Sequence, residues 1–148
     1  MTDIYKFLAD HRIEYERHDH PPVFTVEDVH RLVPPLPAAK TKSLFLRDTK
    51  GLRHFLIIVR GEKRVNLKAL PTILNSSKLD PGSVSIFAAA NDMDKAVEII
   101  IDTALWESDA FQFHPLVNTS TLVISRDNIK RFLGKTGHET QVLDVPGL

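Results

Sequence analysis

Short apolar runs separated by turn residues are the dominant pattern of this chain. Within them, hydrophobic side chains alternate with polar ones or follow one another directly, as in half-buried or fully buried β-strands. Asp48-Thr49-Lys50-Gly51, between two such runs, has the composition of a hairpin turn. The strands predicted from this pattern span Ile13–Arg17, Ser43–Leu46, Arg53–Val59, Ala96–Asp102, Ser120–Ile124 and Gln141–Val145, with a short extended piece beginning at Val65.

Capping residues precede the segments in which apolar side chains recur at helical spacing. A side-chain oxygen at the cap can accept a hydrogen bond from the first turn of the helix, and a carboxylate three residues later strengthens the signal at Thr25. The first predicted helix runs from Ile4 to about His11 after the cap Asp3, and the second begins at Thr25 and stops before Pro34. A third runs from Asn66 through Leu70 and is ended by Pro71, and a helical turn is predicted around Ala104–Trp106. The last is capped by Ser125, has a core face of Ile129, Phe132 and Leu133, and has its C-cap at Gly134.

Runs of strands with hairpin turns, and helices near the ends, predict an α+β fold. We expect one domain over residues 1–148, with a mixed, mostly antiparallel sheet and flanking helices. The composition, 43% hydrophobic and 26% charged, is ordinary for a soluble globular protein. No apolar run approaches membrane-spanning length and the N-terminus lacks the apolar core of a signal peptide, so a cytoplasmic location without membrane association is expected. The absence of cysteine excludes disulfides, thiolate catalysis and thiolate metal sites.

Charge is unevenly distributed although the net charge is zero. Between Lys40 and Lys68 there are nine Lys and Arg residues against Asp48 and Glu62, whereas Asp80 to Asp109 carries seven acidic residues against one lysine. This asymmetry has two interpretations: a basic face that steers a polyanion, or two solvated faces with no partner. Charge alone slightly favours the second.

Candidate chemistry is concentrated between Phe113 and Thr121, where an imidazole, a carboxamide and three hydroxyls lie between two apolar segments. Pro115 restricts the backbone of His114 toward extended geometry. Polar groups at the mouth of a sheet are typical of small-molecule sites. A capped turn, in which Asn118 and the hydroxyls bind loop backbone, explains this stretch about equally well.

Two further stretches favour the functional interpretation: Lys42 at the entry of an apolar strand, and the turn Asp80-Pro81-Gly82 opening into another strand. Over nearly the whole chain, the ordered set resembles the free-standing aminoacyl-tRNA deacylases related to the editing insertion of bacterial prolyl-tRNA synthetase. The segments that carry this resemblance are His20-Pro21-Pro22, Thr41-Lys42-Ser43-Leu44-Phe45-Leu46, Asn91-Asp92, Phe113-His114-Pro115-Leu116 with Asn118, and Gly137-His138.

The resemblance implies the editing-domain fold and hydrolysis of the ester that joins a wrong amino acid to the 3′ end of a tRNA, most simply alanyl-tRNA(Pro). It implies no cofactor. Its expected partners are the acceptor end of an aminoacyl-tRNA and prolyl-tRNA synthetase. The catalytic positions carried over are Lys42, Gly82 and His114, and the substrate-binding positions are Ser43, Ser83, Ile86 and Asn118.

For each of these residues a structural role is the alternative. Lys42 would otherwise be one exposed lysine in a basic segment, and Gly82 part of a plain turn. A binding role for His114 is favoured over direct proton transfer, since an isolated histidine is more often structural. His18 and His20 have metal-compatible spacing, but no patterned acidic or thiolate partner surrounds them, so no metal is expected.

Three departures from the family pattern keep other functions open. Leu79 meets Asp80-Pro81-Gly82 almost directly where relatives have a longer helical passage, Ile86 stands where many have proline, and Ser43 stands where asparagine is frequent. A non-catalytic module that binds tRNA or a synthetase is therefore the alternative class. Within the enzyme class, cysteinyl-tRNA(Pro) is the alternative substrate.

Overall fold

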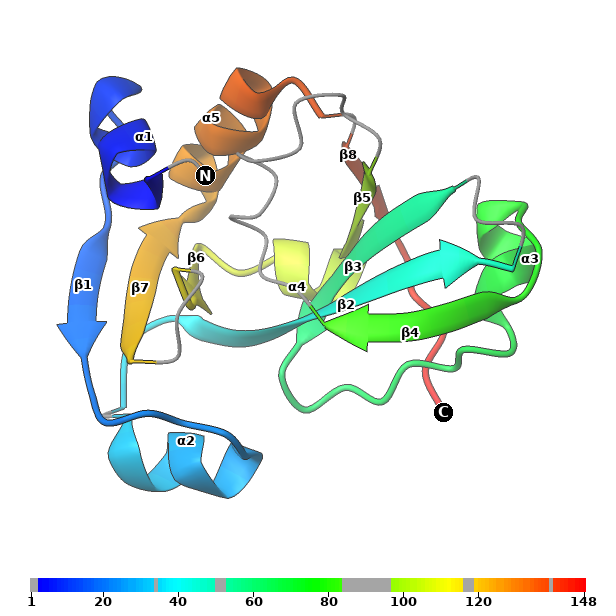
Figure 1. The fold of residues 1–148 in the computed structure, drawn as a ribbon, viewed down its shortest axis with the longest axis horizontal. Coiled ribbons are helices and arrows are strands. Elements are labelled where there is room, and N and C mark those ends of the chain that lie inside the picture. Colours follow the sequence, from blue (N-terminus) through cyan, green and yellow to red (C-terminus); the bar gives the residue numbers. More distant parts are fainter. Residues whose placement is uncertain (1–2, 34, 50–52, 84–96, 116–118, 139) are drawn as a thin grey trace.

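A long central strand, β2, connects the two halves of the molecule (Figure 1). The computed structural model describes residues 3–33, 35–49, 53–83, 97–115, 119–138 and 140–148. The elements in chain order are α1 (Ile4–Asp10), β1 (Glu16–Asp19), α2 (Val26–Leu32), β2 (Ala39–Asp48), β3 (His54–Arg60), α3 (Leu70–Leu74), β4 (Leu79–Ser83), β5 (Val97–Asp102), α4 (Thr103–Trp106), β6 (Ala110–Phe113), β7 (Ser120–Ser125), α5 (Arg126–Thr136) and β8 (Thr140–Leu143).

The strands form one eight-stranded sheet in the order β1-β7-β6-β2-β3-β5-β8, with β4 also paired to β2. Strands β1 and β7, β6 and β7, β2 and β3, and β2 and β4 pair antiparallel. Strands β2 and β6, β3 and β5, and β5 and β8 pair parallel. The predicted α+β fold with a mixed, mostly antiparallel sheet and flanking helices is confirmed.

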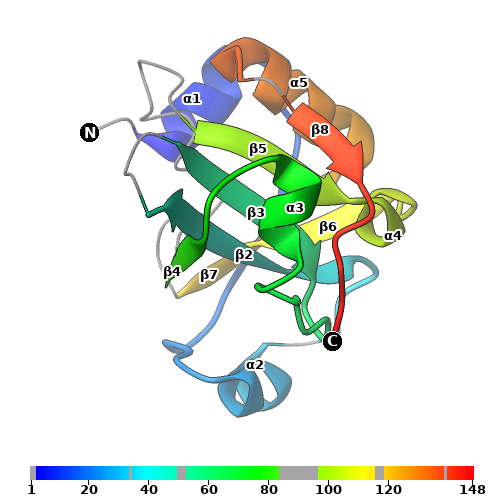
Figure 2. The same ribbon diagram turned by 90° about the vertical axis from the view of Figure 1, so that its right-hand side faces the viewer.

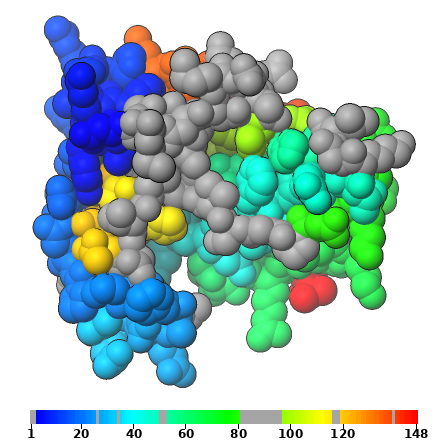
Figure 3. Space-filling view, viewed as in Figure 1, coloured from blue at the N-terminus to red at the C-terminus, as the bar shows by residue number. Residues whose placement is uncertain are grey.

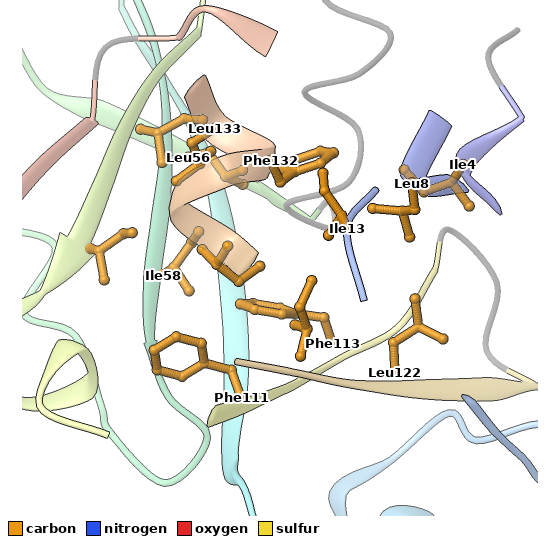
Figure 4. Close-up of a cluster of buried hydrophobic side chains, with 14 of the residues drawn as sticks. Ile4, Leu8, Ile13, Leu56, Ile58, Phe111, Phe113, Leu122, Phe132 and Leu133 are labelled. Carbon is orange, nitrogen blue, oxygen red and sulfur yellow. The ribbon is translucent and has the colours of Figure 1, made fainter. Parts of the chain in front are cut away.

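Two hydrophobic clusters lie on opposite faces of β3 because successive strand residues point to opposite sides. The first, here called the α5 cluster, joins α1 and α5 to the sheet and includes Leu8, Leu56, Ile58, Phe113 and Phe132 (Figure 4). The second, called the α3 cluster, places α3 against the other face (Figure 2). Its buried members are Leu46, Phe55, Ile57, Val59, Leu70, Leu74, Leu79, Ile100 and Val145.

Helix α5 begins as predicted but ends later. The Ser125 side chain accepts a hydrogen bond from the Asn128 backbone N–H, and Ile129, Phe132 and Leu133 are buried. The expected C-cap at Gly134 is wrong, because the helix continues to Thr136. Gly137 ends it in the left-handed conformation, at φ 75°, which favours glycine.

Several other boundaries differ from the sequence predictions. The helix expected from Asn66 to Leu70 begins instead at Leu70 and contains Pro71, whose missing N–H costs nothing in a first turn. Asn66 accepts a hydrogen bond from the Ala69 N–H and so caps only the preceding turn. Strand β1 starts at Glu16 and not at Ile13, which belongs to the α5 cluster. No strand was predicted for β6.

The expected turn at Asp80-Pro81-Gly82 is also wrong, since these residues lie within β4. Asp80 pairs with Arg47, Pro81 with Leu46 and Gly82 with Phe45. Proline lacks a backbone donor, and β4 tolerates it as a short strand paired to β2 alone in the part of the chain that the structure describes. Leu79 and Gly82 lie in the same strand, so the direct passage from Leu79 to Asp80-Pro81-Gly82 seen in the sequence is present in the fold.

Candidate functional site

One edge of β2 is divided between two other strands. Strand β3 runs along the opposite edge from Thr41 to Arg47. On the divided edge, β6 pairs with Ala39 and Lys40, and β4 pairs with the residues from Leu44 to Asp48. Thr41, Lys42 and Ser43 lie between these two pairings. We call this three-residue segment the fork.

Strand directions bring two strand ends toward the fork. Strand β6 is parallel to β2, so its carboxyl end points along β2 toward Lys42. Strand β4 is antiparallel and approaches from the other side, ending with Ser83 opposite Leu44. The Thr41 hydroxyl donates a 2.6 Å hydrogen bond to the Gln112 carbonyl, which ties the fork to β6. The fork is therefore the meeting point of three segments that are distant in sequence.

Side-chain alternation determines which groups share a face at the fork. Leu44 and Leu46 face the α3 cluster, and Lys42 follows the same alternation. On β6, Phe111 and Phe113 belong to the α5 cluster, so the backbone geometry directs Gln112 and then His114 to the opposite side. Lys42 and His114 thus lie on the same side of the sheet. Ser43 alternates to the other side.

The parallel register between β2 and β6 directs the chain that follows β6 toward Lys42. Lys40 pairs with Gln112, and Lys42 and His114 each follow this pair by two residues. His114 is an exposed residue at the end of β6. Surrounding protein nevertheless desolvates its ring and lowers the pKa of His114, which favours the neutral imidazole at neutral pH.

The predicted site residues divide into those near the fork and those outside the described residues. Lys42 and Ser43 are in the fork, Gly82 and Ser83 lie on the adjoining end of β4, and His114 follows β6. Ile86 and Asn118 lie outside the described residues. The roles of all seven stay predictions.

A polar junction between β1 and β7 was not singled out from the sequence. His20 Nδ1 donates to the Pro21 carbonyl at 2.9 Å, and His20 Nε2 forms a 2.8 Å hydrogen bond with the Thr121 hydroxyl. The Ser120 hydroxyl donates to Asp19 at 2.6 Å. In the space-filling view the adjoining ends of β6 and β7, in yellow and orange, reach the surface between β1 and α2 (Figure 3). The available signals were His20-Pro21-Pro22 and the hydroxyls before Leu122.

The basic segment is only partly available to a polyanion. The Arg53 guanidinium makes two 2.9 Å bonds to Glu98 and also donates to the carbonyls of Leu74 and Asn75. Lys63 donates to buried Asp102 at 2.7 Å, and Arg60 donates to Ser108. These three side chains have internal structural contacts, whereas Lys40, Arg47 and Arg64 are exposed.

Metal binding finds no support in the described part of the chain, where no three His, Asp or Glu residues are grouped closely enough to hold an ion. His18 lies 3.6 Å from the Glu16 carboxylate, and His20 is engaged by Thr121 and Pro21. The expectation of no metal stays a prediction. Among the described helices, none has the length and apolarity needed to cross a bilayer.

The fold and the ordered segments define the class of protein. The model of the aminoacyl-tRNA editing domain matches residues 20–81 and 72–132, which include the fork, β4, β6 and β7. The chain belongs to the aminoacyl-tRNA editing domain family.

Its similarity to individual proteins extends over most of their length. The prolyl-tRNA editing protein ProX of Acetoanaerobium sticklandii is 27% identical over 152 residues, covering 93% of each chain. Prolyl-tRNA synthetase associated domain-containing protein 1 of Xenopus laevis is 30% identical over 145 residues, covering 84% of each.

Solved structures support the fold. A hypothetical protein, APE2540, superimposes with a TM-score of 0.69 at 14% identity, covering 96% of this chain and 97% of that one. A structure described provisionally as a trans-editing enzyme for prolyl tRNA synthetase gives a TM-score of 0.61 at 15% identity, covering 99% and 98%.

Proposed function

We propose that this protein is a trans-acting deacylase that hydrolyses mischarged tRNA, with alanyl-tRNA(Pro) as its main substrate. The observation that carries the proposal is the convergence at the fork of the Lys42 strand, the end of β4 and His114. Family membership and the similarity to a prolyl-tRNA editing protein support the same reaction. Prolyl-tRNA synthetase is the proposed source of the mischarged tRNA.

The reaction needs few groups because an aminoacyl ester is already activated. Hydrolysis adds the hydroxyl of water to the ester carbonyl carbon, breaks the bond to the ribose oxygen and returns a proton to that oxygen. Backbone N–H groups near Gly82 can approach the carbonyl closely since glycine has no Cβ, and they would stabilise the developing oxyanion. Lys42 would hold a ribose or phosphate oxygen, or the ester itself, with its ammonium.

The role proposed for His114 is to orient the water molecule that attacks the ester. Its lowered pKa keeps a ring nitrogen unprotonated at neutral pH, so the imidazole can accept a hydrogen bond from the attacking water. This role orients the water and does not require full proton transfer.

Selectivity for alanine follows from size. A synthetase pocket built for proline gains only about 1–3 kcal/mol over the smaller alanine, so a second site that excludes the larger cognate residue restores fidelity. Ile86 is the proposed wall of that site, and Ser43, Ser83 and Asn118 are proposed contacts to the aminoacyl-adenosine.

The decisive assay incubates purified protein in excess with alanyl-, cysteinyl- and prolyl-tRNA(Pro) and measures release of each amino acid. We expect rapid release of alanine and sparing of the prolyl form. Lys42→Ala should lower the alanine rate by about 100-fold, the typical cost of losing one electrostatic stabiliser. Lys40→Ala is the matched control, because Lys40 lies two residues away and contacts His30 of α2. Equal rates of alanine release by Lys42→Ala and wild type would show that Lys42 has no role in the reaction.

A second candidate function is a non-catalytic module that binds tRNA. The direct passage from Leu79 to Gly82 within β4 favours it, because the family pattern described above has a longer helical passage at this place. Acceptor-stem binding without release of any amino acid would establish this candidate and refute the deacylase.

A further inference from the structure

Gln112 of β6 holds the beginning of β2 through two hydrogen bonds. Its backbone carbonyl accepts a 2.6 Å bond from the Thr41 hydroxyl, and its side-chain amide donates a 2.8 Å bond to the Ala38 carbonyl. Gln112 is 7% exposed, so the protein largely shields both bonds from competing water. One buried residue therefore fixes the chain at Ala38, just before β2, and again at Thr41 inside it.

The opposite edge of β2 is held at the same place. The Gly61 N–H donates a 2.9 Å hydrogen bond to the Lys40 carbonyl. A Cβ added to Gly61 would lie 3.3 Å from the Lys40 Cβ, so the turn after β3 packs closely against β2 here. Residues 38–41 are thus held by β6 on one side and by the β3 turn on the other.

Lys42 directly follows this held segment. The Thr41 hydroxyl bond fixes the backbone from which the Lys42 side chain departs, and β3 supports it through the pairing of Lys42 with Val59. The lysine ammonium lies at the end of a flexible four-carbon stem, so a small change in backbone direction is magnified at the charge. A misplacement of about 1 Å in a group that acts on a reacting bond can cost about 100-fold in rate.

We propose that Thr41 and Gln112 are positioning residues for Lys42 in the deacylation reaction. Their hydrogen bond sets the backbone of β2 and thereby the place where the Lys42 ammonium meets the aminoacyl ester. Neither residue needs to touch the substrate for this effect. The inference rests on the proposed function and extends it to two residues to which the sequence assigned no role.

Thr49 provides a matched control at the other end of β2. Its hydroxyl also links this strand to a distant segment, because it donates a 3.2 Å hydrogen bond to the Ser77 hydroxyl. Thr49 follows Asp48, the last residue of β2, whereas Thr41 lies near the first. Thr49→Val therefore makes the same change, from hydroxyl to methyl, at the end of the strand remote from Lys42.

The kinetic test measures single-turnover release of alanine from alanyl-tRNA(Pro), at a temperature where circular dichroism shows every variant to be folded. Thr41→Val keeps the shape of the side chain without its donor. Its maximal rate constant should fall about 10- to 100-fold, while the protein concentration that gives half of this rate changes less than about threefold. Thr41→Ser and Thr49→Val should stay within about threefold of wild type. Equal rate constants for Thr41→Val and Thr49→Val would overturn the proposal.

Gln112→Met tests the second bond, because it removes the amide that binds Ala38 and leaves the carbonyl that binds Thr41. The rate constant should fall by about 3- to 10-fold, less than in Thr41→Val, since one of the two attachments remains. A rate constant equal to that of wild type would exclude Gln112 from the positioning role.

A double-mutant cycle with Lys42→Ala separates positioning from a merely structural role. If Thr41 acts through Lys42, Thr41→Val should slow the Lys42→Ala protein by less than about threefold, because the group that it positions is already absent. A loss as large as in the wild-type background would show that Thr41 acts independently of Lys42, which contradicts the proposal.

A further measurement does not depend on turnover. In protein that contains carbon-13-labelled lysine, the NMR signal of the Lys42 ε-methylene is identified by its disappearance in Lys42→Ala. Thr41→Val should shift this signal, and Thr49→Val should leave it in place; an unshifted signal in Thr41→Val would refute the positioning role. A wild type that releases no amino acid from any of the tRNAs would instead refute the proposed function, so the two failures are distinguishable.

Discussion

The ion pair between Lys63 and Asp102 is predicted to be a main support of the C-terminal segment. Asp102 is 2% exposed and accepts a 2.7 Å bond from Lys63 and a 3.0 Å bond from the Val145 N–H. The Asn66 N–H donates to the Pro146 carbonyl, and Val65 forms a bridge with Gly147. Asp102 therefore joins β5 to the turn that contains Lys63 and to the segment that follows β8.

The expected cost of breaking it can be estimated from burial. Lys63→Met keeps most of the aliphatic stem but leaves the Asp102 carboxylate buried with only the Val145 bond among the contacts described. Removing one partner of a buried pair costs about 3–5 kcal/mol, and the 24% exposure of the Lys63 side chain favours the lower value, about 3 kcal/mol. For a chain of this size the melting temperature should fall by about 10 °C.

Urea unfolding followed by circular dichroism, together with a thermal scan, measures both quantities. Arg64→Met is the control, since its exposed side chain is one residue away, and it should change stability by less than about 0.5 kcal/mol. Lys63→Met/Asp102→Asn should recover at least half of the loss because a carboxamide needs no counter-charge. A loss below about 1 kcal/mol in Lys63→Met would refute the reasoning, since it would show that water solvates Asp102 without its partner.

Three further outcomes follow from the charges and the site. Charge reversal at Arg47 and Arg64 should weaken tRNA binding and flatten its salt dependence, by about one unit of slope per lost phosphate contact, without altering amino-acid preference; filter binding across a salt series measures this. Because the folded pKa of His114 is lowered, its contribution to stability is fully present above the ordinary histidine pKa and is lost as pH falls through the folded value. His114→Ala should therefore lose less stability on acidification than wild type, and deacylation by wild type should persist below the ordinary pKa of histidine. If the free energy of unfolding of the two proteins falls equally steeply with decreasing pH, this prediction is wrong. Ile86→Ala should broaden release toward larger amino acids in a competition assay, and an unchanged profile would assign Ile86 to packing.

Local sequence signals were reliable where local interactions decide the structure. Helix α5 could be predicted because its cap, its apolar spacing and its flanking strand all lie within a short segment. The misplaced C-cap shows the limit of such signals, since Gly134 is compatible with the helix interior and only the left-handed Gly137 ends it. Asp80-Pro81-Gly82 has the composition of a turn, yet pairing with β2 makes it a strand.

Long-range contacts were beyond sequence reasoning. The bond between His20 and Thr121 joins residues 101 positions apart, and the bond between Lys63 and Asp102 joins residues 39 apart. The same limit affected the basic segment, because Arg53 and Lys63 look available in the sequence but have internal carboxylate partners. The site positions came from family resemblance, and only the strand register shows that the strands of Lys42 and Gly82 pair with each other and that the strand before His114 pairs with the same edge of β2.

The divided edge of β2 gives a physical reason for a site at this place in the sheet. A strand edge presents backbone N–H and C=O groups that need partners. Since β6 is parallel and β4 antiparallel to β2, their carboxyl ends both approach Thr41–Ser43, and the described parts of these two strands pair with β2 on either side of these three residues. The proposed substrate ester has a carbonyl and ribose hydroxyls, and the meeting of these strand ends at Lys42 is the topological reason for proposing that it binds at this place in the sheet.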